Sequence, residues 1–249
     1  YQILHQAPTE YQLAFFSATA DRSLESIEKI TGKTFETIDV TAEDDSRKGL
    51  RHYFLRVPIR KKDDYLRRLT HIEDFHGLIF FNQLTELGVM EEKLLYRGVP
   101  VGSLASDQNK LLRKAALEQF KKKMVRALLT TDVAARGLDI TGLPYVVNAE
   151  VPLSEEAYLH RSGRTGRMGN EGIVITLVRD NNLRDLKRLL RPSNITLEEI
   201  FLYGGKLQTE QPTKEDAAPA VNKKYAKTFS GKEQNPEYNK EKIRKKFKN

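Results

Sequence analysis

The stretch Ala127-Leu128-Leu129-Thr130-Thr131-Asp132 is a short apolar run that ends in two threonines and an aspartate. A continuous run of this length, without alternation of apolar and polar residues, is typical of a strand that is buried on both faces. We therefore predict a strand over Ala127–Thr131. Its polar end then lies where α/β sheets bind their ligands, outside the carboxyl ends of the strands.

Five further runs are also short, apolar and rich in β-branched residues. They are His52–Val57, Leu78–Phe81, Val101–Leu104, Tyr145–Asn148 and Ile173–Val178. Between and after them lie patterns typical of helices, at Lys61–Ile72, Leu84–Leu95, Lys110–Lys122, Glu155–His160 and Asn181–Leu190. Strands that alternate with helices of this length predict an α/β fold with a doubly wound parallel sheet.

The same patterns divide the chain into segments. The doubly wound region is predicted to span residues 49–205. Residues 1–40 contain a predicted strand, Gln12–Phe16, and a predicted helix, Arg22–Thr31, and the polar residues 41–48 are predicted to be a linker. Residues 206–249 are rich in lysine and poor in clustered apolar residues, so we predict a disordered basic tail.

The composition narrows the range of functions. The 249-residue chain has a net charge of +8, and the absence of cysteine excludes disulfides and thiol chemistry. Residues 222–249 hold ten lysines and arginines against three glutamates, so this segment carries most of the surplus. A basic balance suits a polyanionic partner such as nucleic acid. The longest apolar runs are too short to cross a membrane, and we expect a cytoplasmic protein without a membrane partner.

The segment His160-Arg161-Ser162-Gly163-Arg164-Thr165-Gly166-Arg167 places three arginines at intervals of three residues. Arginines three apart lie on the same side of a helical turn, so they can converge on one anion. A guanidinium group donates two parallel hydrogen bonds, which suits phosphate oxygens. The glycines between the arginines allow the backbone to approach the same anion. The segment therefore predicts a phosphate-binding site.

This segment resembles motif VI of the DEAD-box RNA helicases. Four other segments resemble motifs of that family and occur in its order: Ser17-Ala18-Thr19 (motif III), Leu78–Asn82 (motif IV), Arg113 of the Q-x-x-R motif, and Leu129–Ile140 (motif V). The resemblance covers about residues 12–178. It implies the RecA-like carboxyl-terminal domain of an ATP-dependent RNA helicase, with residues 1–40 as the end of the first RecA-like lobe.

On the nucleotide side, the resemblance implies that Arg164 and Arg167 are catalytic arginine fingers that bind the γ-phosphate of ATP. It also implies that Asp139 accepts hydrogen bonds from the ribose and that Gly137 allows the backbone to come close. The implied cofactors are ATP and Mg²⁺, with the metal held mainly by the first lobe. No metal ligand is implied in this chain.

On the RNA side, the resemblance implies four binding residues, which are Phe81, Lys110, Arg113 and Thr131. Such residues hold phosphates and carry no sequence information, so the expected partner is single-stranded or short duplex RNA of any sequence. Lys110 departs from the family, which usually has glutamine there, and could replace a polar contact with a charged one. Three residues are implied to couple the two lobes: Ser17, Thr19 and His160.

Two side chains keep alternative interpretations at this stage. Arg161 matches a motif VI position that either joins a structural ion pair or faces the nucleotide. Arg136 pairs either with Asp132 or with an acidic group outside this chain. The sequence does not decide between these roles.

We therefore predict the carboxyl-terminal lobe of a DEAD-box helicase that unwinds short RNA duplexes with ATP. The chain has no phosphate loop and no Asp-Glu-Ala-Asp motif and does not begin with methionine, so we expect an amino-terminally truncated chain that is inactive alone. The alternatives are a non-enzymatic RNA-binding or regulatory module and a DNA-directed relative, whose motif VI usually begins with glutamine instead of His160. The tail either tethers RNA non-specifically or only improves solubility.

Overall fold

A computed structural model describes residues 12–15, 23–38, 49–104, 110–166 and 171–213. The chain forms two compact units, Tyr1–Asp45 and Ser46–Asn249. In the first unit, helix α2 covers Ser23–Thr31, as predicted. The helix ends at Gly32, whose φ of +63° is typical of a helix terminus and whose N–H donates to the Glu28 carbonyl at 2.8 Å.

The strand predicted over Gln12–Phe16 is wrong for the four residues that the structure describes there. Gln12–Phe15 form neither strand nor helix, and the described part of this unit contains no strand. A strand requires a hydrogen-bonded neighbour, so an apolar run without one remains irregular. The ring of Phe15 instead makes an edge contact with Phe35, with 5.3 Å between their centroids.

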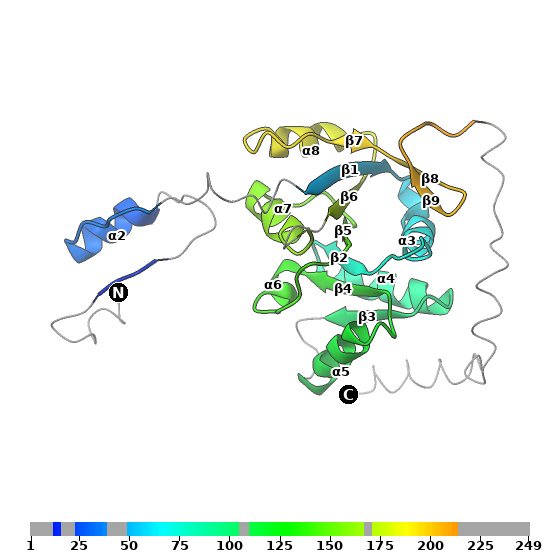
Figure 1. Ribbon diagram of the computed structural model, residues 1–249, viewed down its shortest axis with the longest axis horizontal. Helices are drawn as coiled ribbons and strands as arrows, with labels where there is room; N and C mark the ends of the chain where they lie inside the picture. The colour runs from blue at the N-terminus through cyan, green and yellow to red at the C-terminus, as the bar shows by residue number, and fades with distance from the viewer. Residues whose placement is uncertain (1–11, 16–22, 39–48, 105–109, 167–170, 214–249) are drawn as a thin grey trace. The chain divides into compact units, whose positions relative to one another are not determined.

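The second unit contains a seven-stranded sheet in which every described pair of neighbours is parallel (Figure 1). The strands are β1 (Leu50–Arg56), β2 (Gly77–Phe81), β3 (Val101–Leu104), β4 (Ala127–Thr131), β5 (Tyr145–Asn148), β6 (Gly172–Val178) and β7 (Glu198–Glu199). Their order across the sheet is β3-β4-β2-β5-β6-β1-β7. The doubly wound α/β prediction is confirmed. The six predicted strands appear within two residues of their expected bounds.

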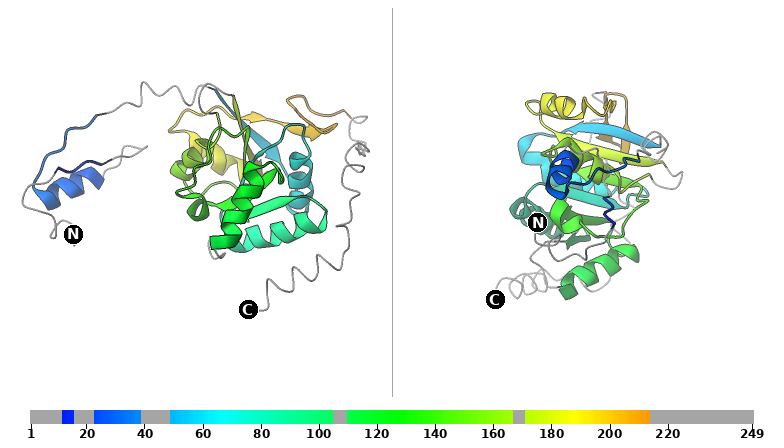
Figure 2. Two further views of the ribbon diagram at one scale, coloured as in Figure 1. Left: turned by 60° about the horizontal axis from the view of Figure 1, so that its bottom comes forward. Right: turned by 90° about the vertical axis from the view of Figure 1, so that its left-hand side faces the viewer.

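Helices cover both faces of this sheet (Figures 1 and 2). One face packs against α3 (Lys62–Thr70) and α4 (Leu84–Tyr96), with the short 3-10 helix η3 (Ile59–Lys61) before α3. The other face packs against α5 (Lys110–Lys121), α6 (Asp132–Ala135), α7 (Glu155–Ser162) and α8 (Leu183–Leu190).

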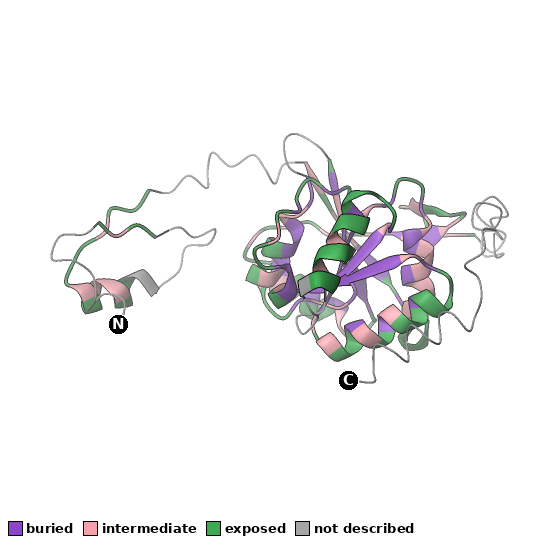
Figure 3. Cartoon of the chain, turned by 90° about the horizontal axis from the view of Figure 1, so that it is seen from below, coloured by how far each residue is buried: buried purple, intermediate pink, exposed green. Residues whose placement is uncertain are grey.

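Alternation along the strands divides the apolar side chains between two cores. In β2, Leu78 and Phe80 pack on the face of α7 and α8, and Ile79 and Phe81 pack on the face of α3 and α4. Successive side chains of a strand point to opposite faces, and here both faces are covered. β1, beside the edge strand β7, is partly exposed, whereas β2, β3 and β4 are buried along their whole length (Figure 3). This explains why they are continuous apolar runs in the sequence.

The ordered part of the second unit extends past the predicted boundary at Gly205. A hairpin of β8 (Phe201–Tyr203) and β9 (Lys206–Gln208) follows β7, and the Arg68 guanidinium donates to the Leu202 carbonyl. The prediction that disorder begins at residue 206 is thus wrong for Lys206–Gln208. The apolar Leu207, which pairs with the buried Leu202, explains why this segment folds back. Residues 214–249 lie outside the described residues.

Candidate functional site

The buried arginine of α7 organises the carboxyl edge of the sheet. The Ser154 hydroxyl caps the amino end of α7 by accepting from the Ala157 N–H at 3.1 Å. In the last turn of the helix, Arg161 is only 1% exposed. It donates to both carboxylate oxygens of Asp132, from Nε at 2.7 Å and from Nη2 at 2.6 Å. A bidentate pair of this kind fixes the orientation of the guanidinium.

The remaining donors of Arg161 reach the ends of two other strands. Nη2 donates to Asn82 Oδ1 at 2.9 Å, and Nη1 donates to Asn148 Oδ1 at 3.2 Å. Asn82 follows β2, Asn148 ends β5, and Asp132 follows β4. The guanidinium also lies 5.2 Å from the centre of the Phe80 ring. Arg161 is therefore the structural residue of motif VI, and its pair with Asp132 explains the role that the sequence left open.

A second set of polar groups anchors the same helix to the sheet. Asn148 Nδ2 donates to Thr176 Oγ1 at 3.1 Å. Tyr158 Oη and His52 Nδ1 are hydrogen-bonded at 2.8 Å. Burial lowers the pKa of His52 to about 4 and raises the pKa of Tyr158, so both groups are uncharged near neutral pH. The buried face of α7 is thus fixed at Tyr158 and at Arg161.

The turn after α7 carries the first predicted arginine finger. Arg164 N–H donates to the Arg161 carbonyl at 3.1 Å, and Arg164 Nη1 donates to the Leu138 carbonyl at 2.8 Å. Leu138 lies between Gly137 and Asp139, so the structure brings Arg164 next to the segment predicted to bind the ribose. Gly137 has a φ of +70°, a conformation that favours glycine, and Asp139 is exposed. Three of the four predicted nucleotide-binding residues are therefore neighbours.

Close packing holds this turn against the sheet. Thr165 pairs with Leu143 in an isolated parallel bridge, and its hydroxyl donates to the Leu143 carbonyl. Gly166 has a φ of +67°, and a Cβ there would collide with Leu50. A Cβ on Gly172 would collide with Thr165 and with the Gly166 backbone. Gly166 and Gly172 therefore serve the packing of the turn.

The predicted RNA-binding residues fall into three groups. Thr131 and Arg113 both contact α6, since the Thr131 hydroxyl accepts from the Ala134 N–H at 3.3 Å and Arg113 Nη2 donates to the Ala134 carbonyl at 2.7 Å. They are brought together at the carboxyl end of β4, as expected. Phe81 is 0% exposed in the core, so its side chain has no surface for RNA and that prediction needs correction. The side chain of Lys110 lies outside what the structure describes.

The predicted coupling residues are only partly described. His160 is exposed on α7, with Nε2 at 3.9 Å from Glu156 Oε1, and its other side is open to solvent. Ser17, Thr19 and the second predicted finger, Arg167, lie outside the described residues. Their roles therefore stay predictions.

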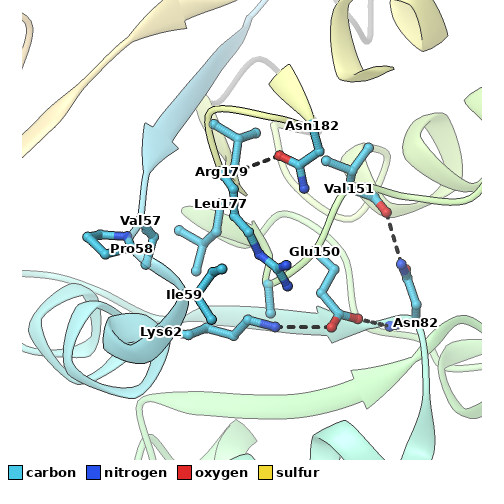
Figure 4. A pocket seen from close by; sticks show the side chains of 12 residues that line it. Val57, Pro58, Ile59, Lys62, Asn82, Glu150, Val151, Leu177, Arg179 and Asn182 are labelled. Atoms are coloured by element: carbon cyan, nitrogen blue, oxygen red, sulfur yellow. Dashed lines mark hydrogen bonds and ion pairs between the residues drawn. The ribbon is translucent and has the colours of Figure 1, made fainter. Parts of the chain in front are cut away.

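A polar pocket of about 220 Å³ lies at the carboxyl ends of β1, β2, β5 and β6 (Figure 4). Glu150 accepts from Lys62 Nζ at 3.0 Å and from the Asn82 backbone N–H at 3.0 Å. Burial raises the pKa of Glu150, but the Asn82 N–H and the Lys62 ammonium outweigh it and leave the pKa lowered. Asn82 Nδ2 also donates to the Val151 carbonyl at 2.9 Å.

Sequence analysis missed Asn82, Asn148 and Glu150 as site residues. Each is a single polar residue at the end of an apolar run, and that position was the available signal. Among the described residues, no group of three or more His, Asp or Glu side chains could hold a metal ion. Within the same residues, no helix is long and apolar enough to cross a membrane.

Comparisons with known proteins agree with this geometry. Residues 61–169 match the helicase conserved C-terminal domain. The chain is 36% identical to a probable ATP-dependent RNA helicase, YfmL, of Bacillus subtilis, over 84% of this chain and 55% of that protein. It is 32% identical to the DEAD-box ATP-dependent RNA helicase CshC of Bacillus cereus, over 92% of this chain and 57% of that protein. The chain thus spans about half the length of these curated relatives.

Solved structures show the same fold. The C-terminal domain of the DEAD-box protein Dbp5 aligns with a TM-score of 0.55 and 27% identity, over 61% of this chain and 89% of that one. The S. cerevisiae Dbp5 structure bound to RNA and ADP BeF3 aligns with a TM-score of 0.68 and 25% identity, over 80% of this chain and 53% of that one. The fold and the turn after α7 that carries Arg164, here called the arginine turn, define a RecA-like helicase carboxyl-terminal domain. The chain therefore contains a helicase conserved C-terminal domain, and its sequence relatives and structural neighbours include DEAD-box RNA helicases.

Proposed function

We propose that this chain is the carboxyl-terminal lobe of an ATP-dependent RNA helicase, which unwinds short RNA duplexes together with a first RecA-like lobe. The observation that carries the proposal is the position of Arg164, whose guanidinium is held at the Leu138 carbonyl between Gly137 and Asp139. A cation, a carboxylate and a glycine turn at one surface suit the phosphates and the ribose of a nucleotide. The curated relatives named above are ATP-dependent RNA helicases.

In this proposal, residues near the turn after α7 bind the nucleotide, and residues at the carboxyl end of β4 bind RNA. Arg164, with Arg167, compensates the negative charge of the transferring phosphoryl group, and Asp139 accepts hydrogen bonds from the ribose. Thr131 and Arg113 lie at the carboxyl end of β4 and contact RNA phosphates. ATP and Mg²⁺ are the proposed cofactors, with the metal held mainly by the first lobe. His160 would couple this lobe to Ser17 and Thr19.

The test compares Arg164→Ala with Arg60→Ala in the full-length protein. Arg60 is exposed in η3, away from the arginine turn, and serves as the matched control. Loss of an arginine finger lowers the rate of ATP hydrolysis about 10³- to 10⁵-fold. We expect this loss in RNA-stimulated phosphate release for Arg164→Ala alone. Equal rates for the two variants would contradict the role of Arg164.

The 249-residue chain tests whether this lobe is inactive alone, and the full-length protein separates the enzyme from a non-enzymatic RNA-binding module. We expect it to hydrolyse ATP no faster than background, with or without RNA. RNA-stimulated hydrolysis by the purified chain, abolished by Arg164→Ala, would contradict this. If the full-length protein binds RNA but shows no ATP hydrolysis, the RNA-binding or regulatory module replaces the helicase. Unwinding of RNA duplexes and of DNA duplexes by the full-length protein is then compared. Preference for DNA would favour the DNA-directed relative.

A further inference from the structure

Helix α8 has two sharply different faces. Its inner face packs Leu183, Leu186 and Leu190 into the core beside β1 and β7 (Figure 1). The opposite face is exposed and carries mainly cations, which are Arg184, Lys187, Arg188 and, just after the helix, Arg191. Positions 184, 188 and 191 are four and three residues apart, so these arginines form one ridge. At 1.5 Å per residue the ridge is about 10 Å long.

Most of these cations have no carboxylate partner among the described residues. Arg188 pairs with Asp185 at 2.9 Å, and both side chains are more than half exposed, so that pair contributes little. Nearby carboxylates bind other groups: Asp180 and Glu199 pair with Arg56, and Glu155 accepts from Ser193.

The other face of the sheet shows the contrast. Three cations of α3, α4 and the turn that follows are paired with carboxylates: Lys62 with Glu86 and Glu150, Arg67 with Asp64, and Arg97 with Asp63. The cations of α8 therefore differ from these three, each of which has a carboxylate partner.

The stability of the helix does not account for this surplus. Lys187, Arg188 and Arg191 lie near the carboxyl end of α8, where cations complement the helix dipole. Arg184 lies in the first turn, where the dipole favours an anion and a cation is unfavourable. A cation kept at an unfavourable position without a partner suggests a ligand outside the domain.

We propose that the α8 ridge, formed by Arg184, Arg188 and Arg191, is an accessory surface that binds the phosphate backbone of RNA. The inference rests on the proposed function, because RNA is the partner proposed there. The turn before α8 begins at Arg179, at the carboxyl end of β6, and Arg179 and Asn182 line the polar pocket together with Asn82. The pocket therefore connects the carboxyl end of β2, which neighbours β4, with the start of α8.

The chemistry of the ridge favours RNA over an acidic protein. All three ridge cations are arginines, whose planar forks match phosphate oxygens and whose charge is permanent. The three arginines can each contact one backbone phosphate of an RNA strand. No apolar side chain interrupts the ridge, whereas the centres of protein interfaces are depleted in charge and rich in aromatic residues.

The test compares two triple variants of the complete 249-residue chain. R184Q/R188Q/R191Q removes the ridge charge, and K93Q/K122Q/K206Q removes the same charge from three exposed positions elsewhere. Glutamine keeps helix propensity, so both variants should fold like the wild type, as judged by circular dichroism and thermal unfolding. Binding of a fluorescent single-stranded RNA of mixed sequence is then measured over a range of salt concentrations.

The ridge variant should lower the slope of log affinity against log salt by about 2, since each phosphate contact to single-stranded RNA contributes about 0.7. The control variant should change the slope much less. Equal slopes for the two variants would overturn the accessory surface and leave the proposed function standing, provided that the wild type binds RNA. Absence of RNA binding by the wild type would count against both. If the ridge variant loses affinity for poly-glutamate as strongly as for RNA, the assignment to RNA fails.

Discussion

Helices α7 and α8 pack on the same face of the sheet and use arginine in opposite ways. On α7, Arg161 is buried and its donors are shared among Asp132, Asn82 and Asn148. On α8, the arginines are exposed, and one surface pair with Asp185 is their only carboxylate contact within the described chain. Because both helices use arginine, the burial and the partners of each side chain decide its role. A buried, fully bonded arginine holds the fold, whereas an exposed, unpaired one is available to a ligand.

The largest expected effect on stability comes from replacing the buried Arg161 of α7. Arg161→Met removes one partner of a buried pair and leaves Asp132, Asn82 and Asn148 without their donor. The Asn148 amide is 0% exposed and would lose a donor, and the 36% exposed Asp132 would lose two charged hydrogen bonds, which together cost about 3–4 kcal/mol. We expect a decrease of this size in the free energy of unfolding, measured by urea denaturation.

Arg188→Met on α8 is the matched control for this experiment. Its pair with Asp185 is exposed, so the free energy of unfolding should change by less than about 0.5 kcal/mol. If the two variants lose similar amounts of unfolding free energy, burial does not explain the different roles of arginine on α7 and α8.

The second effect concerns the other anchor of α7, the hydrogen bond between His52 and Tyr158. Burial lowers the pKa of His52 to about 4, against 6.5 for the exposed side chain. The unfolded chain therefore binds more protons between these two values, and His52 makes the fold less stable as pH falls from about 6.5 to 4. The shift corresponds to on the order of 3 kcal/mol at its limit.

His52→Gln removes this titration and keeps a polar side chain. Unfolding free energies of the wild type and of the variant, measured from about pH 7 to about pH 4, should diverge most at the neutral end and converge at low pH. The variant retains His76, whose pKa is also lowered by burial, so part of the pH dependence should remain. Parallel curves for the two proteins would mean that His52 is not held neutral by the fold.

The same comparison shows what the sequence can predict. Strands β2 to β6 were predictable because burial on both faces leaves continuous apolar runs, and α8 because its leucines recur at helical spacing. The run at Gln12–Phe16 has the same composition, and its described residues still form no strand, because pairing depends on a neighbour that the run does not specify. Gln12, Ala14 and Phe15 are also exposed, so an apolar run forms a buried strand only where neighbouring elements cover it.

The site was predictable where a motif has several residues in order, as in the turn at Arg164. It was not predictable for the partners of Arg161. Asn82, Asn148 and Asp132 are 79, 13 and 29 residues away from Arg161 in sequence, and only the order of the strands brings them together. Phe81 ends the apolar run Leu78–Phe81, whose continuity already indicated burial, and its side chain lies in the core.

The smallest expected effect, and the sharpest for α8, is that of Arg184→Glu. A carboxylate in the first turn complements the helix dipole, and this one would stand four residues before Arg188, an orientation that stabilises helices. Each term contributes about 0.3–0.5 kcal/mol, so the variant should unfold at slightly higher urea concentration than the wild type. RNA affinity should nevertheless fall, because a negative charge then faces the phosphates. If stability falls together with affinity, Arg184 serves the fold, and the distinction drawn between α7 and α8 is lost at this position.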